Sequence, residues 1–296
     1  METGLIVSRV SKYDDDVASR QKLIPSWKQE KLEQAHVLVV GAGALGNEVV
    51  KNLILFGVGN IYVVDFDYVV ISNLNRCIFF RRDDALKRRA KVDALALRAA
   101  ELSPYQHTRI FPVNADIHGI PFDHELYKVT QVYVSCLDSL AARLTLNSAA
   151  VHNKKPLIDG GMSGFIGYVQ VVIPDYTACL YCNLAENELK ALFHRLSCSG
   201  TPFEFTEPKI PALPSTTSIL GAVMAQEVVK VLLGFDYFQE TGTWPKETGL
   251  PLAGKRLFIN SALNFYGVYD LERNSQCEVC SSGRSEAKNL YSPENT

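Results

Sequence analysis

The chain has 296 residues and a formal net charge of −2, and 47% of its residues are hydrophobic, enough for a large buried core. A nearly neutral charge gives no electrostatic reason to expect a nucleic acid or a membrane surface as a partner. We see no apolar run of membrane-spanning length and no signal peptide. Seven cysteines, four of them in close pairs, suit metal binding in a reducing compartment, so we expect a cytoplasmic protein.

Strands and helices alternate along the first half of the chain. Strands are predicted at 36–40, 61–65, 108–114, 131–136 and 156–160. Helices are predicted at 27–35, 44–57, 84–102 and 139–152. This alternation predicts an α/β fold with a Rossmann-like, doubly wound and mainly parallel sheet.

The second half predicts antiparallel strands that extend this sheet, at 164–173, 256–260 and 264–270. Between them, 183–214 is expected to hold one short helix and an extended loop. A strong helix is expected at 215–234, capped by Ser215 or Thr216 and ended by Gly234.

A glycine-rich loop follows the first strand, with Gly41, Gly43 and Gly46 in the G-x-G-x-x-G pattern. Such a loop between a strand and a helix holds a nucleotide phosphate, although a tight turn alone would also need glycine. Asp65 ends the next strand and is placed to accept hydrogen bonds from ribose hydroxyls. These features fit an NAD-dependent dehydrogenase as well as an enzyme that uses ATP.

The following stretch favours ATP. Asp67, Asn73 and Arg76 come soon after Asp65, and Lys91 lies further along. Guanidinium and ammonium groups neutralise the dense charge of a triphosphate, which a dinucleotide redox site does not need. The remaining basic residues nearby are as well explained by a solvated helix face, namely Arg81, Arg82, Arg88 and Arg89.

Asp138 follows the fourth strand, where a carboxylate can reach a Mg²⁺ ion bound to the triphosphate. The same residue could instead cap the next helix. Arg143 and Asn147 lie four residues apart on one face of that helix and could support the strand end.

Two Cys-x-x-Cys pairs lie far apart in the chain, Cys179/Cys182 and Cys277/Cys280. Two pairs with identical spacing predict a four-thiolate zinc site. Four thiolates leave no open coordination position, so this Zn²⁺ is expected to be structural. Redox chemistry at one pair is the alternative.

Taken together, these motifs resemble the ubiquitin-activating enzyme superfamily, most closely its compact MoeB/ThiF branch. The similarity runs from about residue 13 to residue 280 and includes VLVVGAGALGNEVVKNLILFGVGNIYVVDFD, SNLNR, RRAKVDAL, CLDSLAARLTLN, CLYC and CEVC. The resemblance implies a single adenylation domain over 1–296. Its expected parts are a helical arm (1–35), a nucleotide-binding core (36–178), a zinc hairpin with a cysteine loop (179–214) and a C-terminal part (215–296).

The family uses Mg·ATP to adenylate the C-terminal glycine carboxylate of a ubiquitin-like protein. The resemblance implies that Asp65 binds ribose, that Asn73, Arg76 and Lys91 serve the phosphates, and that Asp138 binds Mg²⁺. Arg20, in Ser19-Arg20-Gln21, matches an arginine finger that reaches into the partner's site of a homodimer, although the family's more common version reads Arg-Tyr-Ser-Arg-Gln.

Three cysteines remain outside the two pairs. Cys136 ends an apolar strand and is expected in the core, and Cys77 lies beside Arg76. Cys198 falls in the interval where the compact branch carries its acyl-acceptor cysteine, so the resemblance implies a thioester there. The resemblance also suggests that the carrier docks over the later strands, near Phe165, Tyr168 and Phe203.

Two pathways remain open for such an enzyme. One activates a modifier with a C-terminal Gly-Gly and passes it through a thioester to a conjugating enzyme. The other adenylates a sulfur-carrier protein for molybdopterin, thiamin or tRNA thiolation. The Thr-Thr-containing run at 211–218 favours conjugation slightly. A zinc-containing oxidoreductase and a non-catalytic scaffold are more distant alternatives.

Overall fold

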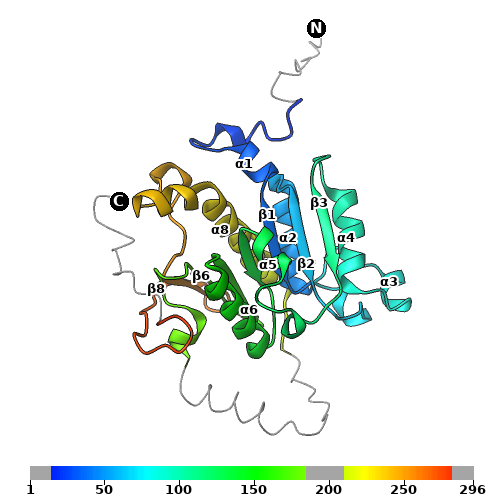
Figure 1. Cartoon of the computed structure of the whole chain (residues 1–296). Helices are drawn as coiled ribbons and strands as arrows, with labels where there is room; N and C mark the ends of the chain where they lie inside the picture. Colours follow the sequence, from blue (N-terminus) through cyan, green and yellow to red (C-terminus); the bar gives the residue numbers. More distant parts are fainter. Residues whose placement is uncertain (1–14, 185–209, 282–296) are drawn as a thin grey trace, which may run out of the picture.

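Eight strands form one mixed sheet in the order β3-β2-β1-β4-β5-β6-β7-β8 in the computed structural model, which describes residues 15–184 and 210–281 (Figure 1). The parallel part comprises β1 (His36–Val40), β2 (Asn60–Val64), β3 (Arg109–Val113), β4 (Val132–Ser135) and β5 (Leu157–Ser163). The antiparallel part comprises β6 (Ile166–Val172), β7 (Lys255–Asn260) and β8 (Phe265–Asp270). The mainly parallel sheet with an antiparallel extension confirms the predicted fold.

Helices cover both faces of the sheet. They are α1 (Gln29–Glu33), α2 (Ala44–Phe56), α3 (Arg82–Leu86), α4 (Lys91–Leu102), α5 (Glu125–Val129), α6 (Leu140–Asn153) and α8 (Pro214–Thr241). Short 3₁₀ turns lie at Gln21–Leu23, Ile71–Asn73, Ile117–Gly119, Leu180–Asn183 and Lys246–Thr248. The helices α2, α4 and α8 share one apolar core with the sheet, and α5 and α6 share the core on its other face.

The predicted single helix at 84–102 is wrong, because the chain forms two helices there. The first ends at Leu86, and Arg88 takes a left-handed backbone with φ of 47°. The amide of Arg89 then donates to the carbonyl of Asp84 at 2.9 Å, which closes the end of α3. The chain turns back before α4 begins at Lys91.

Two predictions about the helix at 215–234 are also wrong. Leu213 is the N-cap, and neither predicted residue caps α8 with a side-chain hydrogen bond. The helix continues past Gly234 to Thr241, and this glycine admits a close neighbour within the helix instead of ending it. A Cβ there would lie 3.0 Å from the ring of Trp244, tighter than most such contacts.

Among the described residues, α8 is the one helix long and apolar enough to cross a membrane, and 56% of its most apolar window is buried within the protein. It packs along α2 and across β5 and β6 as a core helix.

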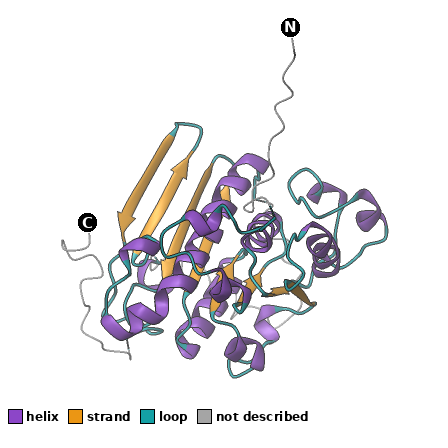
Figure 2. Cartoon of the chain, turned by 90° about the horizontal axis from the view of Figure 1, so that it is seen from above, coloured by secondary structure: helices purple, strands orange, loops and turns teal. Residues whose placement is uncertain are grey.

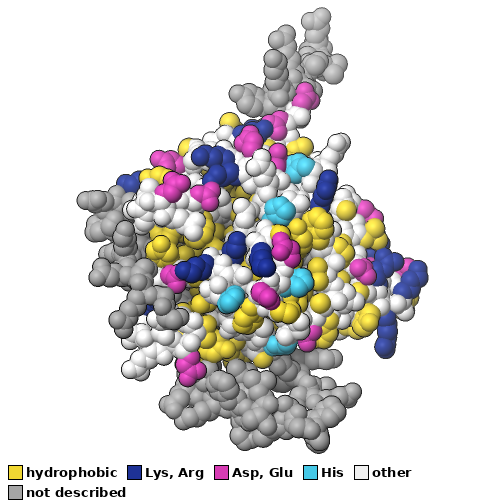
Figure 3. Space-filling view, in the orientation of Figure 1, with side chains coloured by type: hydrophobic (Ala, Val, Ile, Leu, Met, Phe, Trp, Pro, Cys, Tyr) yellow, Lys and Arg dark blue, Asp and Glu magenta, His cyan; other side chains and the backbone are white. Residues whose placement is uncertain are grey.

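The antiparallel end of the sheet is less covered than the parallel part. Figure 2 shows part of the sheet extending clear of the helices, and β8 has exposed apolar side chains such as Tyr266 and Val268. On the face shown in Figure 3, basic and acidic side chains are intermixed, in keeping with the small net charge.

Candidate functional site

The glycine loop joins β1 to α2 at the carboxyl end of the sheet. Gly41 has φ of 100°, and a Cβ at this residue would lie 2.5 Å from the carbonyl oxygen of Cys136. Gly46 packs against Gly41, where a Cβ would lie 1.8 Å from the carbonyl oxygen. By contrast, a Cβ at Gly43 would meet open space. Two of the glycines therefore close the turn, and the third leaves room beside it.

The start of α2 offers an anion-binding position beside this space. Gly43 is the N-cap of this 13-residue helix, and no side chain caps it. The free amides and the helix dipole both favour a phosphate there. The buried side chain of Asn47 fixes the loop by donating to the carbonyls of Ala42 and Gly43, both at 2.9 Å, and by accepting from the amide of Phe79.

Asp65 lies directly after β2 and faces the glycine loop. Its carboxylate accepts from the amides of Ala42 at 2.7 Å and Asp67 at 2.8 Å. Burial raises the pKa of Asp65 above its usual value, while the charge of Lys91 acts in the opposite direction. The acid predicted for ribose is therefore beside the loop.

Lys91 approaches the same place from the start of α4. Its ammonium binds the carboxylate of Asp67 at 2.6 Å. Burial would lower the pKa of Lys91, but the charges of Asp65 and Asp67 outweigh burial and raise it. Asn73, Arg76 and Lys91 are the residues predicted to bind phosphate. Of these, Lys91 lies close to both acids, Asp65 and Asp67.

The other two members of that set bind local partners. Arg76 donates to the carbonyl of Ser72 and to the side chain of Asn75, and the Asn73 side chain accepts from the amide of Val70. Neither contact requires a ligand, so the assignment of both residues to phosphates stays a prediction.

Asp138 is exposed in the loop between β4 and α6. The alternative that it caps α6 is wrong, since Ser139 is the N-cap and no side chain there makes a capping hydrogen bond. An exposed carboxylate after β4, the neighbour of the strand β1 that precedes the glycine loop, has the right chemistry for a divalent cation.

A buried charge pair supports this strand end. Arg143 donates to both oxygens of Asp159 at 3.0 and 3.2 Å, and the hydroxyl of Tyr168 donates to Asp159 at 2.9 Å. Asn147 accepts from the amide of Leu180. Both α6 residues therefore make structural contacts, Arg143 with β5 beside the end of β4 and Asn147 with the turn at Leu180–Asn183.

The two cysteine pairs meet in space and form the one group among the described residues that is placed to hold a metal ion. Their four sulfur atoms lie within 4.8 Å of one another, with separations of 3.4 Å for Cys182–Cys280 and 3.7 Å for Cys179–Cys277. A tetrahedral zinc ion with Zn–S bonds of about 2.3 Å sets its sulfur atoms about 3.8 Å apart. The predicted cluster is thus brought together, with geometry that suits zinc.

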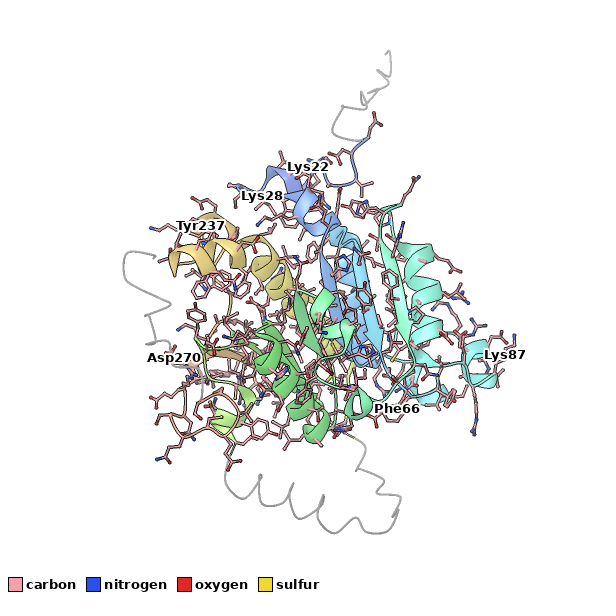
Figure 4. The ribbon with its side chains drawn as sticks, viewed as in Figure 1. Lys22, Lys28, Phe66, Lys87, Tyr237 and Asp270 are labelled. Carbon is pink, nitrogen blue, oxygen red and sulfur yellow. The ribbon has the colours of Figure 1, made fainter. Side chains whose placement is uncertain are left out.

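Arg20 lies at the other end of α2 from the glycine loop. Its neighbour Gln21 donates to the carbonyl of Leu55, near the end of that helix. Figure 4 shows Lys22 and Phe66, which follows Asp65, at opposite ends of the molecule. Thirteen helical residues span about 20 Å, so Arg20 is far from its own glycine loop.

The remaining predicted cysteines and Phe203 fall into two groups. Cys198 and Phe203 lie outside the described residues. Cys77 and Cys136 are buried, and burial raises the pKa of both thiols, that of Cys77 to about 11. Burial and a raised pKa make both thiols poor nucleophiles.

Sequence reasoning missed two residues that organise the site, Asn47 and Asp159. Each carried a signal, because each is a polar residue placed where the sequence pattern predicts burial. Asn47 follows the last glycine of the loop, and Asp159 lies within a buried strand, where an acid needs a partner.

The glycine loop and the strand-end acids are typical of a nucleotide-binding α/β protein, and the cysteine cluster is placed to hold a metal ion. A family model described as the ThiF family matches residues 15–279. The chain belongs to the ThiF family, which confirms the resemblance stated from its motifs.

Relatives of known sequence support the same class. A sulfur carrier protein adenylyltransferase from Thermus thermophilus is 30% identical over 92% of this chain and 93% of its own length. The Nedd8-activating enzyme E1 catalytic subunit of Drosophila melanogaster is 35% identical, but the match spans 51% of this chain and 35% of that protein. The chain is therefore an enzyme of the adenylyltransferase and E1-like class.

Solved structures agree on the fold. The crystal structure of E. coli MccB with ATP aligns with a TM-score of 0.68 at 20% identity, covering 91% of this chain and 76% of that one. The crystal structure of PaaA aligns with a TM-score of 0.63 at 21% identity, covering 92% and 86%.

Proposed function

We propose that this enzyme uses Mg·ATP to adenylate the C-terminal glycine carboxylate of a ubiquitin-like or sulfur-carrier protein ending in Gly-Gly. The proposal rests on one convergence at the carboxyl ends of β1, β2 and β4. The uncapped N-terminus of α2, the half-buried acid Asp65, the cation Lys91 and the exposed acid Asp138 all lie at this edge of the sheet. This set supplies groups for phosphate, ribose and a divalent cation.

The chemistry needs little more than placement and charge neutralisation. The carboxylate oxygen of the carrier attacks the α-phosphorus of ATP, the bond to the β-phosphate oxygen breaks, and pyrophosphate leaves. The carboxylate is already ionised, so no general base is required. Lys91 and the free amides of α2 would neutralise phosphate charge, and Asp138 would hold Mg²⁺, which offsets the charge on the leaving pyrophosphate.

The next step separates two pathways. We favour thioester transfer to Cys198 and handover to a conjugating enzyme, as the sequence suggested. Sulfur-carrier activation has comparable support, since the Thermus relative with that name matches along nearly the full length. The two outcomes differ chemically. In the first, the Cys198 thiolate displaces AMP and leaves a thiol-cleavable thioester on the enzyme. In the second, an external sulfur donor displaces AMP and leaves a thiocarboxylate on the carrier.

We further propose a homodimer in which Arg20 serves the nucleotide of the partner subunit. Its distance from its own glycine loop supports this arrangement. The cysteine cluster would hold a structural Zn²⁺ ion that joins the two cysteine segments. The described cysteines form no disulfide, which is consistent with the reducing environment of the cytoplasm.

ATP–pyrophosphate exchange tests the proposal directly. We expect exchange that requires Mg²⁺ and a carrier ending in Gly-Gly, and that falls at least about a hundred-fold in Asp138→Ala. Asp83→Ala, which changes an exposed acid on the outlying helix α3, should exchange normally. Carrier-independent exchange, or no exchange by folded wild-type protein, would contradict it.

A further inference from the structure

A short antiparallel contact places Asp67 beside Lys91. The amide of Val69 donates to the carbonyl of Arg89, and the amide of Lys91 donates to the carbonyl of Asp67, both at 2.9 Å. Tyr68 and Ala90 form the bridge between the two segments. These backbone contacts thus keep Asp67 and Lys91 adjacent, independently of the ion pair between their side chains.

The two acids of this segment have different partners. Asp65 accepts from backbone amides of the glycine loop and its own turn, whereas the carboxylate of Asp67 binds the Lys91 ammonium at 2.6 Å. The Lys91 side chain is only 13% exposed, while that of Asp67 is 54% exposed. The lysine therefore stays within the site, and its carboxylate partner faces solvent.

An ion pair of this kind is easily exchanged. Water solvates the half-exposed carboxylate of Asp67 well, so this partner can leave the pair at small cost, whereas the mostly buried ammonium of Lys91 still requires an anion beside it. A β- or γ-phosphate carries more charge than one carboxylate and would compete for the same ammonium.

We propose that Asp67 is a positioning residue that competes with the phosphates of ATP for Lys91 and recovers the lysine when pyrophosphate leaves. The inference rests on the proposed function. Asp67 would thereby lower the affinity of the site for triphosphate and pyrophosphate, but not for AMP, which lacks the phosphates that Lys91 would serve. Pyrophosphate would then leave faster. This limits the reverse reaction, in which pyrophosphate attacks the adenylated carrier and re-forms ATP.

Calorimetric binding at low ionic strength tests this, because salt screens exposed charges. The titrants are Mg·ATP, Mg·pyrophosphate and AMP. We expect Asp67→Asn to bind the first two about three-fold more tightly and AMP with unchanged affinity. In a Lys91→Met background the same substitution should change none of the three. Asp83→Asn is the matched control, because Asp83 also pairs with a lysine, Lys87, on the periphery of the molecule (Figure 4).

Three results would overturn the inference. Asp67→Asn could leave triphosphate binding unchanged or weaken it, which would indicate a direct role in ligand or metal binding. It could tighten binding equally in the Lys91→Met background, which would indicate general repulsion between Asp67 and phosphate. Wild-type protein that binds no nucleotide would overturn the proposed function as well, so the two failures are distinguishable.

Discussion

The buried pair between Arg143 and Asp159 gives the sharpest test of how the site is supported. Asp159 is fully buried and accepts from Arg143 and from the hydroxyl of Tyr168. In Asp159→Asn the shape is kept but the carboxylate charge is lost, which leaves the Arg143 guanidinium buried without a counter-ion. Breaking a buried pair in this way costs about 3 kcal/mol or more.

Thermal unfolding measures this cost. At about 2–4 °C per kcal/mol for a protein of this size, the melting temperature should fall by about 6–12 °C. The exposed pair Lys255–Asp270 provides the control, because Asp270→Asn should cost less than about 0.5 kcal/mol. Since α6 begins just after Asp138, we also expect weaker Mg·ATP binding in Asp159→Asn.

The double variant Arg143→Met/Asp159→Leu separates charge from shape. Replacing both partners with apolar side chains removes the unpaired charge, so at least half of the lost stability should return. A cost below about 1 kcal/mol for Asp159→Asn, or a double variant less stable than the single one, would refute the reasoning.

Three further predictions concern the metal, the dimer and the loop. Cys277→Ser should reduce zinc from about one per chain to near zero, measured by elemental analysis, and lower the melting temperature by about 10 °C or more, since structural zinc binding contributes folding energy. Mixing inactive Arg20→Ala and Asp138→Ala subunits should restore about a quarter of wild-type pyrophosphate exchange if the arginine acts across the dimer, and none if it acts within one chain. Gly46→Ala should destabilise the fold by about 3 kcal/mol in thermal unfolding, whereas Gly43→Ala should melt normally and bind Mg·ATP about ten-fold more weakly by calorimetry.

The parts predicted well from sequence follow from local patterns and parallel topology. Gly41 and Asp65 each follow a buried strand, and neighbouring parallel strands end at the same edge of a sheet, so their proximity could be inferred. The cluster of the two cysteine pairs could also be predicted, because two pairs with identical spacing rarely arise by chance. This prediction did not depend on how the 94 residues between Cys182 and Cys277 fold.

The errors arose where one residue type serves two purposes. The sequence predicts a helix end at Gly234, but glycine also admits a close neighbour, here Trp244. The partner of Asp159 could not be predicted from the sequence. Which cation on a helix pairs with an acid on a strand depends on how the two elements pack, and their separation in the sequence does not reveal this. Arg88 ends a helix in a left-handed conformation that usually belongs to glycine, so nothing in the sequence marked the break.

That break has a consequence for redesign of the chain. Residues 84–102 have good helix-forming composition, and an engineer seeking stability could replace the turn at Arg88 with residues that join α3 to α4. A continuous helix would remove the turn that brings the chain back toward Asp67, and with it the backbone hydrogen bond from Lys91 to Asp67. The resulting protein could be more stable and yet misplace Lys91, the cation that we propose to bind phosphate, whereas Arg88→Gly would relax the backbone and keep the turn. Under the proposed function the irregular turn at Arg88 is needed for nucleotide binding, and screens for stability alone would select against it.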